Sequence, residues 1–186
     1  AGNAITTGDS NVAIGKNSLR TEDTGDYNVA IGHEALYNLN YDGSAYNTVV
    51  GYRAGKSMNT GIQNAILGAE AGDALTTSSN NVLVGYDSGG ATTIGDKNVF
   101  VGSEAGKTNI DGNASVALGY RALYVQEPSS NTNTDNTAVG YQSGVAVTTG
   151  LRNTLLGADT AAALTTGNNN ILIGDSANVS TGAASN

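Results

Sequence analysis

Asn28-Val-Ala-Ile-Gly32 is one copy of a pentad, Asn-x-x-aliphatic-Gly, that recurs ten times in the chain. The copies follow one another at a 17-residue spacing, which is longer only between Gly32 and Gly51 and between Gly119 and Gly140. Self-similarity at a short fixed period is typical of a repeat architecture, in which each unit packs on its neighbours. The repeated glycines are Gly15, Gly32, Gly51, Gly68, Gly85, Gly102, Gly119, Gly140, Gly157 and Gly174.

The 17-residue unit predicts a strand and turns. We number each unit from its Asn as position 1, so that position 4 is always aliphatic and position 8 is always small. The mostly aliphatic run at positions 2 to 4 is bounded by Asn and Gly, which is typical of a short strand. The unit is too short for a strand and a crossover helix. We therefore predict an all-β fold, a parallel β-solenoid or β-roll of about ten 17-residue coils.

The repeat also predicts how the chain is divided. Residues 1–10 have the pattern of the end of a preceding repeat, which indicates a segment cut from a longer protein. Residues 11–179 form the predicted ten-coil repeat domain, with insertions at 36–46 and 123–135. Residues 180–186 are expected to form an irregular C-terminal exit segment.

The asparagine at position 1 predicts a structural ladder, in which side-chain amides bond from coil to coil. Asn also tolerates the left-handed backbone conformation that a corner requires. The glycine at position 5 predicts a positive φ or a close backbone approach. Ser115 is the one exception at position 1, and the ladder asparagines are Asn11, Asn28, Asn47, Asn64, Asn81, Asn98, Asn136, Asn153 and Asn170.

Apolar side chains on both faces of the strand predict an oligomer. Positions 2 and 4 point to one face and position 3 to the other, and we expect positions 2 and 4 to line the interior. Position 3 is then an apolar outer column, and such patches mark interfaces. We predict a homotrimer interface at Val49, Ile66, Leu83, Phe100, Leu155 and Leu172. The alternative is a broad coil in which both faces are internal.

Composition excludes several classes of partner. The chain has 26 Gly, one Pro and no Cys, and its formal charge is −8 with only eight scattered Lys and Arg. Nucleic acid is therefore not an expected partner, because its binding needs clustered cations. No apolar run approaches the roughly 20 residues that span a bilayer, so membrane insertion is not expected. A surface of small polar residues is typical of secreted and virion proteins, and we predict an extracellular location.

Candidate catalytic residues are lacking. A hydrolase needs paired carboxylates at a set separation, or a nucleophile with a base. The single histidine, His33, falls at the variable position 6, and the acidic residues at position 7 suit a solvated face. We predict no enzyme activity, no cofactor and no metal site.

The two insertions are the candidate binding regions, because insertions in solenoids form loops on one face. Together they contain Tyr37, Tyr41, Tyr46 and Tyr124. Tyrosine beside Asn and Asp can stack on sugar rings and bond their hydroxyl groups, which indicates a host-surface glycan as a partner; a host protein is the other choice. A second tyrosine column at position 6 extends this surface: Tyr52, Tyr86, Tyr120 and Tyr141. The alternative is that these loops only cover the roll.

The pentads Asn11-Val-Ala-Ile-Gly15 and Asn28-Val-Ala-Ile-Gly32, each followed by a small residue three positions on, resemble the turns of YadA-like trimeric autotransporter adhesin heads. The longer pattern from Thr148 to Gly157, with Gly51-Tyr-Arg-Ala-Gly55, resembles repeats of bacteriophage tail fibres. The resemblance implies a left-handed β-roll homotrimer in a virion or on a bacterial surface.

Three functions follow from these observations, in order of preference. The first is a structural and adhesive segment of a trimeric phage tail fibre, a rigid spacer with host recognition as an added role. The second is the head of a bacterial trimeric autotransporter adhesin. The third is an ice-binding solenoid, which needs a regular Thr-x-Thr array that positions 13 and 14 do not supply.

Overall fold

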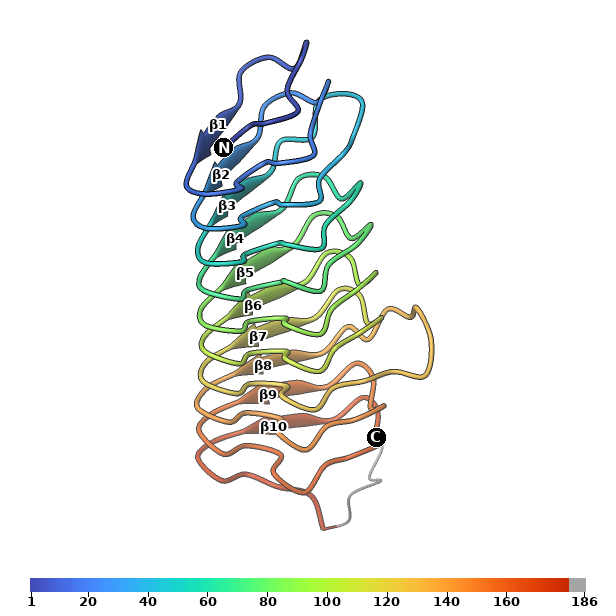
Figure 1. Ribbon diagram of the computed structural model, residues 1–186. Helices are drawn as coiled ribbons and strands as arrows, with labels where there is room; N and C mark the ends of the chain where they lie inside the picture. Colours follow the sequence, from blue (N-terminus) through green and yellow to red (C-terminus); the bar gives the residue numbers. More distant parts are fainter. Residues whose placement is uncertain (181–186) are drawn as a thin grey trace.

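The structure, a computed structural model that describes residues 1–180, is a β-solenoid. Each coil contributes one three-residue strand, and the ten strands lie in chain order in one parallel sheet along one side of the stack (Figure 1). The predicted all-β solenoid of about ten coils is confirmed, whereas its left-handed coiling and trimeric state stay predictions. The strands are β1 (Val12–Ile14), β2 (Val29–Ile31), β3 (Thr48–Val50), β4 (Ala65–Leu67), β5 (Val82–Val84), β6 (Val99–Val101), β7 (Val116–Leu118), β8 (Thr137–Val139), β9 (Thr154–Leu156) and β10 (Ile171–Ile173).

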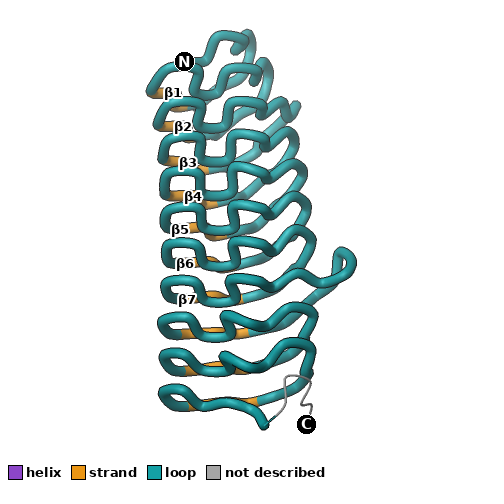
Figure 2. The backbone as a smooth tube through the Cα atoms, turned by 60° about the horizontal axis from the view of Figure 1, so that its bottom comes forward, coloured by secondary structure: helices purple, strands orange, loops and turns teal. Residues whose placement is uncertain are grey.

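Backbone pairing holds successive coils in register. Each strand residue faces its equivalent in the next coil, as Leu83 faces Phe100 between β5 and β6. Pairing continues into the turns, where the Asn59 N–H donates to the Thr76 carbonyl oxygen at 2.8 Å. Figure 2 shows the resulting stack of similar coils. Stacking thus gives hydrogen-bond partners to backbone groups that irregular turns otherwise leave to water.

Position 3 fills the inside of the solenoid, which corrects the predicted assignment of the two strand faces. Its side chains cannot form an outer trimer interface. The prediction is wrong because both faces of the strand are apolar, so the alternation has no polar side to mark the outside. The buried members are Val49, Ile66, Leu83, Phe100 and Leu155, all at most 2% exposed, while Leu172 is half-buried and packs on the same core.

Core volume is shared between positions 3 and 9. Position 9 is Leu in three of the four coils that have Ala at position 3. In the fourth coil it is Gly144, where a Cβ would lie 2.7 Å from Leu155 and 2.9 Å from Leu123, so side chains of the neighbouring coils fill the space. The coil with the largest core residue, Phe100, has Gly106 at position 9, and a Cβ there would lie 2.4 Å from a ring carbon. Close packing therefore links residues six apart in the chain.

Two backbone conformations turn the chain at the ends of each strand. The position-5 glycines have φ between +117° and +149°. A Cβ on Gly68 would lie 2.2 Å from the carbonyl oxygen of Gly85, so no side chain fits there. At the other end the left-handed residue is the one before the Asn, such as Tyr46 at φ 55° and Lys97 at φ 61°. The prediction that Asn itself is left-handed is wrong, because none of the ladder asparagines has a positive φ.

The position-1 asparagines form a hydrogen-bond ladder through their side chains. Asn64 is typical: its Oδ1 accepts from the Asn81 N–H at 3.0 Å, and its Nδ2 donates to the Ser78 carbonyl oxygen at 2.9 Å. The ladder asparagines are buried except Asn11, which is partly exposed in the first coil. Each amide therefore ties its coil to the next one and fixes the turn that precedes the next strand.

Gln126 compensates for the break in this ladder at Ser115. Its Nε2 donates to Ser115 Oγ at 2.8 Å and to Asn109 Oδ1 at 3.1 Å. Its Oε1 accepts from Asn136 Nδ2 at 2.9 Å. Gln126 is fully buried at position 12, where another coil has Leu75. An amide supplied from across the coil thus restores the missing bonds.

The two insertions leave the stack on the turn side. The loop between β7 and β8, which contains residues 123–135, projects away from the strands (Figures 1 and 2). The insertion at 36–46 is tied to the preceding coil by Glu22, a buried carboxylate that accepts from the Tyr41 N–H at 3.3 Å and the Gly25 N–H at 2.7 Å.

The ends of the repeat extend the same pattern. Thr6 N–H donates to the Asp23 carbonyl oxygen at 2.8 Å, so residues before β1 pair as turn residues of a coil. Apart from Ser180, the predicted exit segment 180–186 lies outside the described residues.

Candidate functional site

The outer face of the sheet is apolar and open to solvent. We call positions 2 and 4 of β1 to β10 the outer sheet face; its residues are Val, Ile or Leu everywhere except at Thr48, Ala65, Thr137 and Thr154. Exposure is highest at residues such as Leu67 (52%), Leu156 (47%) and Ile171 (69%), whereas both outer positions of β2, β6 and β8 are partly exposed. A parallel sheet is normally covered on both faces, so this uncovered face is unusual.

The outer sheet face is continuous along the stack. Strands about 4.8 Å apart and three residues long give ten coils a projected area of roughly 480 Å². Monomeric proteins rarely expose a contiguous apolar patch above a few hundred Å². The largest patch on a typical monomer is roughly 300–600 Å² and is often functional, so the regularity of the outer sheet face, more than its area, is that of an interaction surface.

Tyrosines flank the outer sheet face at both ends of the strands. At position 6, Tyr120 stacks on Tyr141 with ring centroids 5.5 Å apart, and His33 stacks on Tyr52 at the same distance. At the Asn end, Tyr27 and Tyr46 stack at 5.1 Å. Such amphipathic rings are enriched at protein interfaces. The position-6 tyrosines, all 38–53% exposed, are Tyr52, Tyr86, Tyr120 and Tyr141.

A ladder of ion pairs runs beside the position-6 column. Lys107 Nζ lies 2.8 Å from carboxylate oxygens of both Asp87 and Glu104. Arg121 Nε is 2.6 Å from Glu104 Oε2. Lys107 and then Arg121 lower the pKa of Glu104, and the carboxylates of Asp87 and Glu104 raise the pKa of Lys107.

A shorter ion-pair cluster of the same kind lies in the earlier coils. Lys56 Nζ is 3.0 Å from Glu34 Oε2, and Arg53 Nε is 3.3 Å from the same oxygen. Lys56, and to a smaller extent Arg53, lower the pKa of Glu34. Charged side chains therefore line the position-7 edge of the turns in both halves of the stack.

The four tyrosines predicted for a binding loop are not brought together. Tyr46 lies at the Asn end of a strand, and Tyr41 is half-buried against the core. Tyr37 and Tyr124 both occupy position 10 but in the second and seventh coils. Tyr37 accepts a hydrogen bond from Arg20 and has that guanidinium 5.1 Å from its ring centroid. The insertions therefore supply no single aromatic platform.

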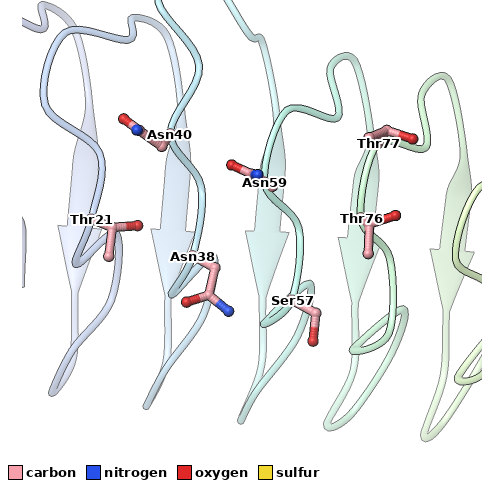
Figure 3. Close-up of a pocket in the computed structure, with 7 residues that line it drawn as sticks. All are labelled: Thr21, Asn38, Asn40, Ser57, Asn59, Thr76 and Thr77. Carbon is pink, nitrogen blue, oxygen red and sulfur yellow. The ribbon is translucent and has the colours of Figure 1, made fainter.

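A polar trough crosses four consecutive coils beside the first insertion. It has a volume of about 490 Å³, and its side chains come from turn segments (Figure 3). Sequence reasoning missed it, although position 11 gave a signal: it is Thr21, Asn38 and Ser57 in the first three coils and alanine in the next two. The lining residues are Thr21, Asn38, Asn40, Ser57, Asn59, Thr76 and Thr77, none of them charged.

The described residues hold no grouped catalytic or metal-binding side chains. Within residues 1–180, no three or more His, Asp or Glu side chains gather in a way that could hold a metal ion. His33 lies against Tyr52, and its Nδ1 is buried without a hydrogen-bond partner. The same part of the chain has no helix long and apolar enough to cross a membrane.

Comparisons with known proteins give no relative from which a function can be transferred. No family model, curated protein or solved structure matches this chain. A function is therefore inferred from the outer sheet face and the polar trough.

Proposed function

We propose that the chain is a structural and adhesive segment of a trimeric fibre, in which three copies pack through the outer sheet face. The observation that carries this proposal is the uncovered column of Val, Ile and Leu along all ten strands. Covering it with equivalent columns of two other copies removes the apolar surface from water. The result is a straight, rigid rod whose length is set by the number of coils.

Threefold packing is supported by the shape of the face. A strand of three residues is only about 10 Å wide. Three narrow faces can enclose a common axis, with equivalent positions of each copy at the same height, and the flanking tyrosines then contact neighbouring copies. The sequence resemblance to trimeric heads and fibres favours this arrangement over a twofold pair.

The proposed location of this fibre is extracellular. Similarity of the Thr148 to Gly157 pattern to tail-fibre repeats favours a phage virion, and the head of a bacterial trimeric adhesin is the alternative. An ice-binding face has less support, because Thr occurs at only three outer positions, Thr48, Thr137 and Thr154, and never twice in one strand. An enzyme has no support from the side chains described above.

Sedimentation equilibrium at micromolar concentration tests the proposal. We expect a mass three times that of the 18.6 kDa chain. Two glutamates on the outer sheet face, Leu67→Glu with Leu118→Glu, should give a folded monomer. The matched control, Ser129→Glu with Asn131→Glu in the projecting loop, should stay trimeric. A wild-type chain that is monomeric over this range would overturn the proposal.

A further inference from the structure

The polar trough lies across the core from the outer sheet face. Position-12 side chains such as Met58 and Leu75 are buried in the core, where a Cβ on Gly72 would lie 2.7 Å from Leu83 and 2.8 Å from Leu75. Side chains at positions 11 and 13, on either side of position 12, therefore face out from the opposite wall. The trough stays open to solvent when the outer sheet face is covered.

The backbone beneath the trough is paired between coils, which makes its shape rigid. Asn40 N–H donates to the Asn59 carbonyl oxygen at 2.8 Å, and Ser57 N–H donates to the Asp73 carbonyl oxygen at 3.0 Å. Thr76 Oγ1 donates to the Thr93 carbonyl oxygen at 3.0 Å, so this hydroxyl is also held in place. A preformed surface avoids part of the ordering cost of binding.

Most of the polar side chains in the trough are available to a ligand. Among residues 1–180, no hydrogen bond to another residue engages the side chains of five lining residues. Figure 3 shows the lining side chains on neighbouring coils, with no strand residue among them. The hydroxyl groups of Thr21 and Thr76 donate to carbonyl oxygens of neighbouring coils, and the five available side chains are those of Asn38, Asn40, Ser57, Asn59 and Thr77.

The chemistry of these groups favours an uncharged, hydroxyl-rich ligand, and the aliphatic carbon that makes up most of the exposed lining suits the C–H surfaces of its rings. Each amide both donates and accepts hydrogen bonds, and so does each hydroxyl. No Lys or Arg lines the trough, and the chain carries a formal charge of −8, so an anionic ligand is disfavoured. An apolar ligand would cover the amides without giving them partners.

The repeat of the trough selects an extended ligand. Its groups recur at the coil spacing of about 4.8 Å along the solenoid axis. Successive sugars of an extended β-1,4-linked chain follow one another at a comparable interval and alternate in the side that they present. Amides and hydroxyl groups, which both donate and accept hydrogen bonds, can pair with either side. The volume of about 490 Å³ falls within the roughly 300–1,000 Å³ of small-molecule sites.

We infer that the polar trough binds a neutral, extended β-linked glycan that lies along the solenoid axis, one sugar to each coil. This inference rests on the adhesive role proposed above, because that role makes a host surface the source of the glycan. No aromatic ring lines the trough, so each trough binds weakly, with a dissociation constant on the order of 1 mM. Three troughs on one trimer raise the avidity for a multivalent surface.

Isothermal titration calorimetry with cellohexaose and chitohexaose tests the inference on the full chain. The triple variant Asn40→Ala, Asn59→Ala and Thr77→Ala should weaken binding at least tenfold. The control Thr148→Ala, Thr149→Ala and Thr166→Ala removes three polar side chains at positions 13 and 14 of later coils, outside the trough, and should bind as wild type. Thermal unfolding of both variants checks that the coils remain folded.

The outcomes separate this inference from the proposed trimer. Binding of neither glycan, equal binding by the trough and control variants, or tighter binding of a hyaluronan hexasaccharide overturns the inference. The trough variant should keep the wild-type sedimentation mass, because its substitutions lie off the outer sheet face. A monomeric wild type that still binds cellohexaose through the trough would overturn the trimer and support the glycan site.

Discussion

The two faces of the ten-stranded sheet carry similar side chains in opposite environments. On the inner face, Leu83 and Phe100 are fully buried, whereas on the outer sheet face Leu67 is 52% exposed. The inner side chains vary in size, from Ala30 to Phe100, and the large buried ones have Gly or Ala at position 9 of the same coil. At Gly144, where both positions are small, side chains of the neighbouring coils fill the space. Among residues 1–180, the outer side chains have no such partner. Hydrophobicity alone therefore does not identify the core; complementary size does.

The largest effect we expect is from emptying the inner face. Phe100→Ala removes a fully buried ring and should lower the free energy of unfolding by about 3–5 kcal/mol, measured by denaturant titration. Gly106→Leu alone should also destabilise, because its side chain would collide with the Phe100 ring.

The double variant tests whether positions 3 and 9 share core volume. The double variant Phe100→Ala with Gly106→Leu reproduces the native pair Ala117 and Leu123 of the next coil, where Leu123 has φ 48°. It should come within about 1.5 kcal/mol of wild type. If the losses of unfolding free energy of the two single variants simply add in the double variant, positions 3 and 9 do not share core volume.

A smaller effect is expected from the polar part of the interior. Gln126→Leu leaves Ser115, Asn109 and Asn136 without these hydrogen-bond partners in a buried site and should cost about 1–3 kcal/mol. Adding Ser115→Asn restores the ladder and should recover most of the loss in chemical denaturation. A double variant no better than Gln126→Leu would show that Gln126 does not stand in for the missing asparagine.

Lowering the pH should reduce the stability of the fold slightly through the ion-pair ladder next to the outer sheet face. The pKa of Glu104 is lowered by Lys107 and Arg121, so its contribution is present above the ordinary Glu pKa and is lost as pH falls through the lowered value. Burial raises the pKa values of Asp73 and Glu127, so their effect on stability has the opposite sign: their ionised forms destabilise the fold, and acid relieves this.

The Tm difference between wild type and Glu104→Gln isolates the ladder from these opposing groups. It should be largest near neutral pH and shrink between about pH 5 and pH 3. A difference that is constant over this range would argue against a role for the Glu104 charge.

The smallest effect on the stability of one chain is expected on the outer sheet face. In the background of Leu118→Glu, at a concentration at which sedimentation shows a monomer, Leu67→Thr should change the free energy of unfolding by less than about 0.5 kcal/mol. The matched inner substitution Leu83→Thr should cost several times more, because it buries a hydroxyl group and leaves a cavity. Equal costs in denaturant titrations would remove the distinction between the faces.

Much of the fold follows from the sequence, because the repeat fixes the period, the strand and the pairing of equivalent positions. The side chain that faces inward did not follow from alternation, since positions 2, 3 and 4 are all apolar in most coils. The pairing of Ala with Leu in three coils, and of Phe100 with Gly106, was present in the sequence and identifies the buried column. Tyr37 and Tyr124 share a position but not a coil, so their common insertion pattern did not predict a common site.

Thiol labelling shows whether copies of the chain cover the outer sheet face, and single sites can be labelled because the chain has no native cysteine. Leu67→Cys places a thiol on that face, and Asn59→Cys places one on the turn side. At tens of micromolar protein, we predict that a maleimide reacts at once with Cys on the turn side and slowly with Cys on the outer sheet face, and that dilution to monomers removes the difference. Equal, fast labelling of both thiols at every concentration would contradict an outer sheet face covered by copies of the chain.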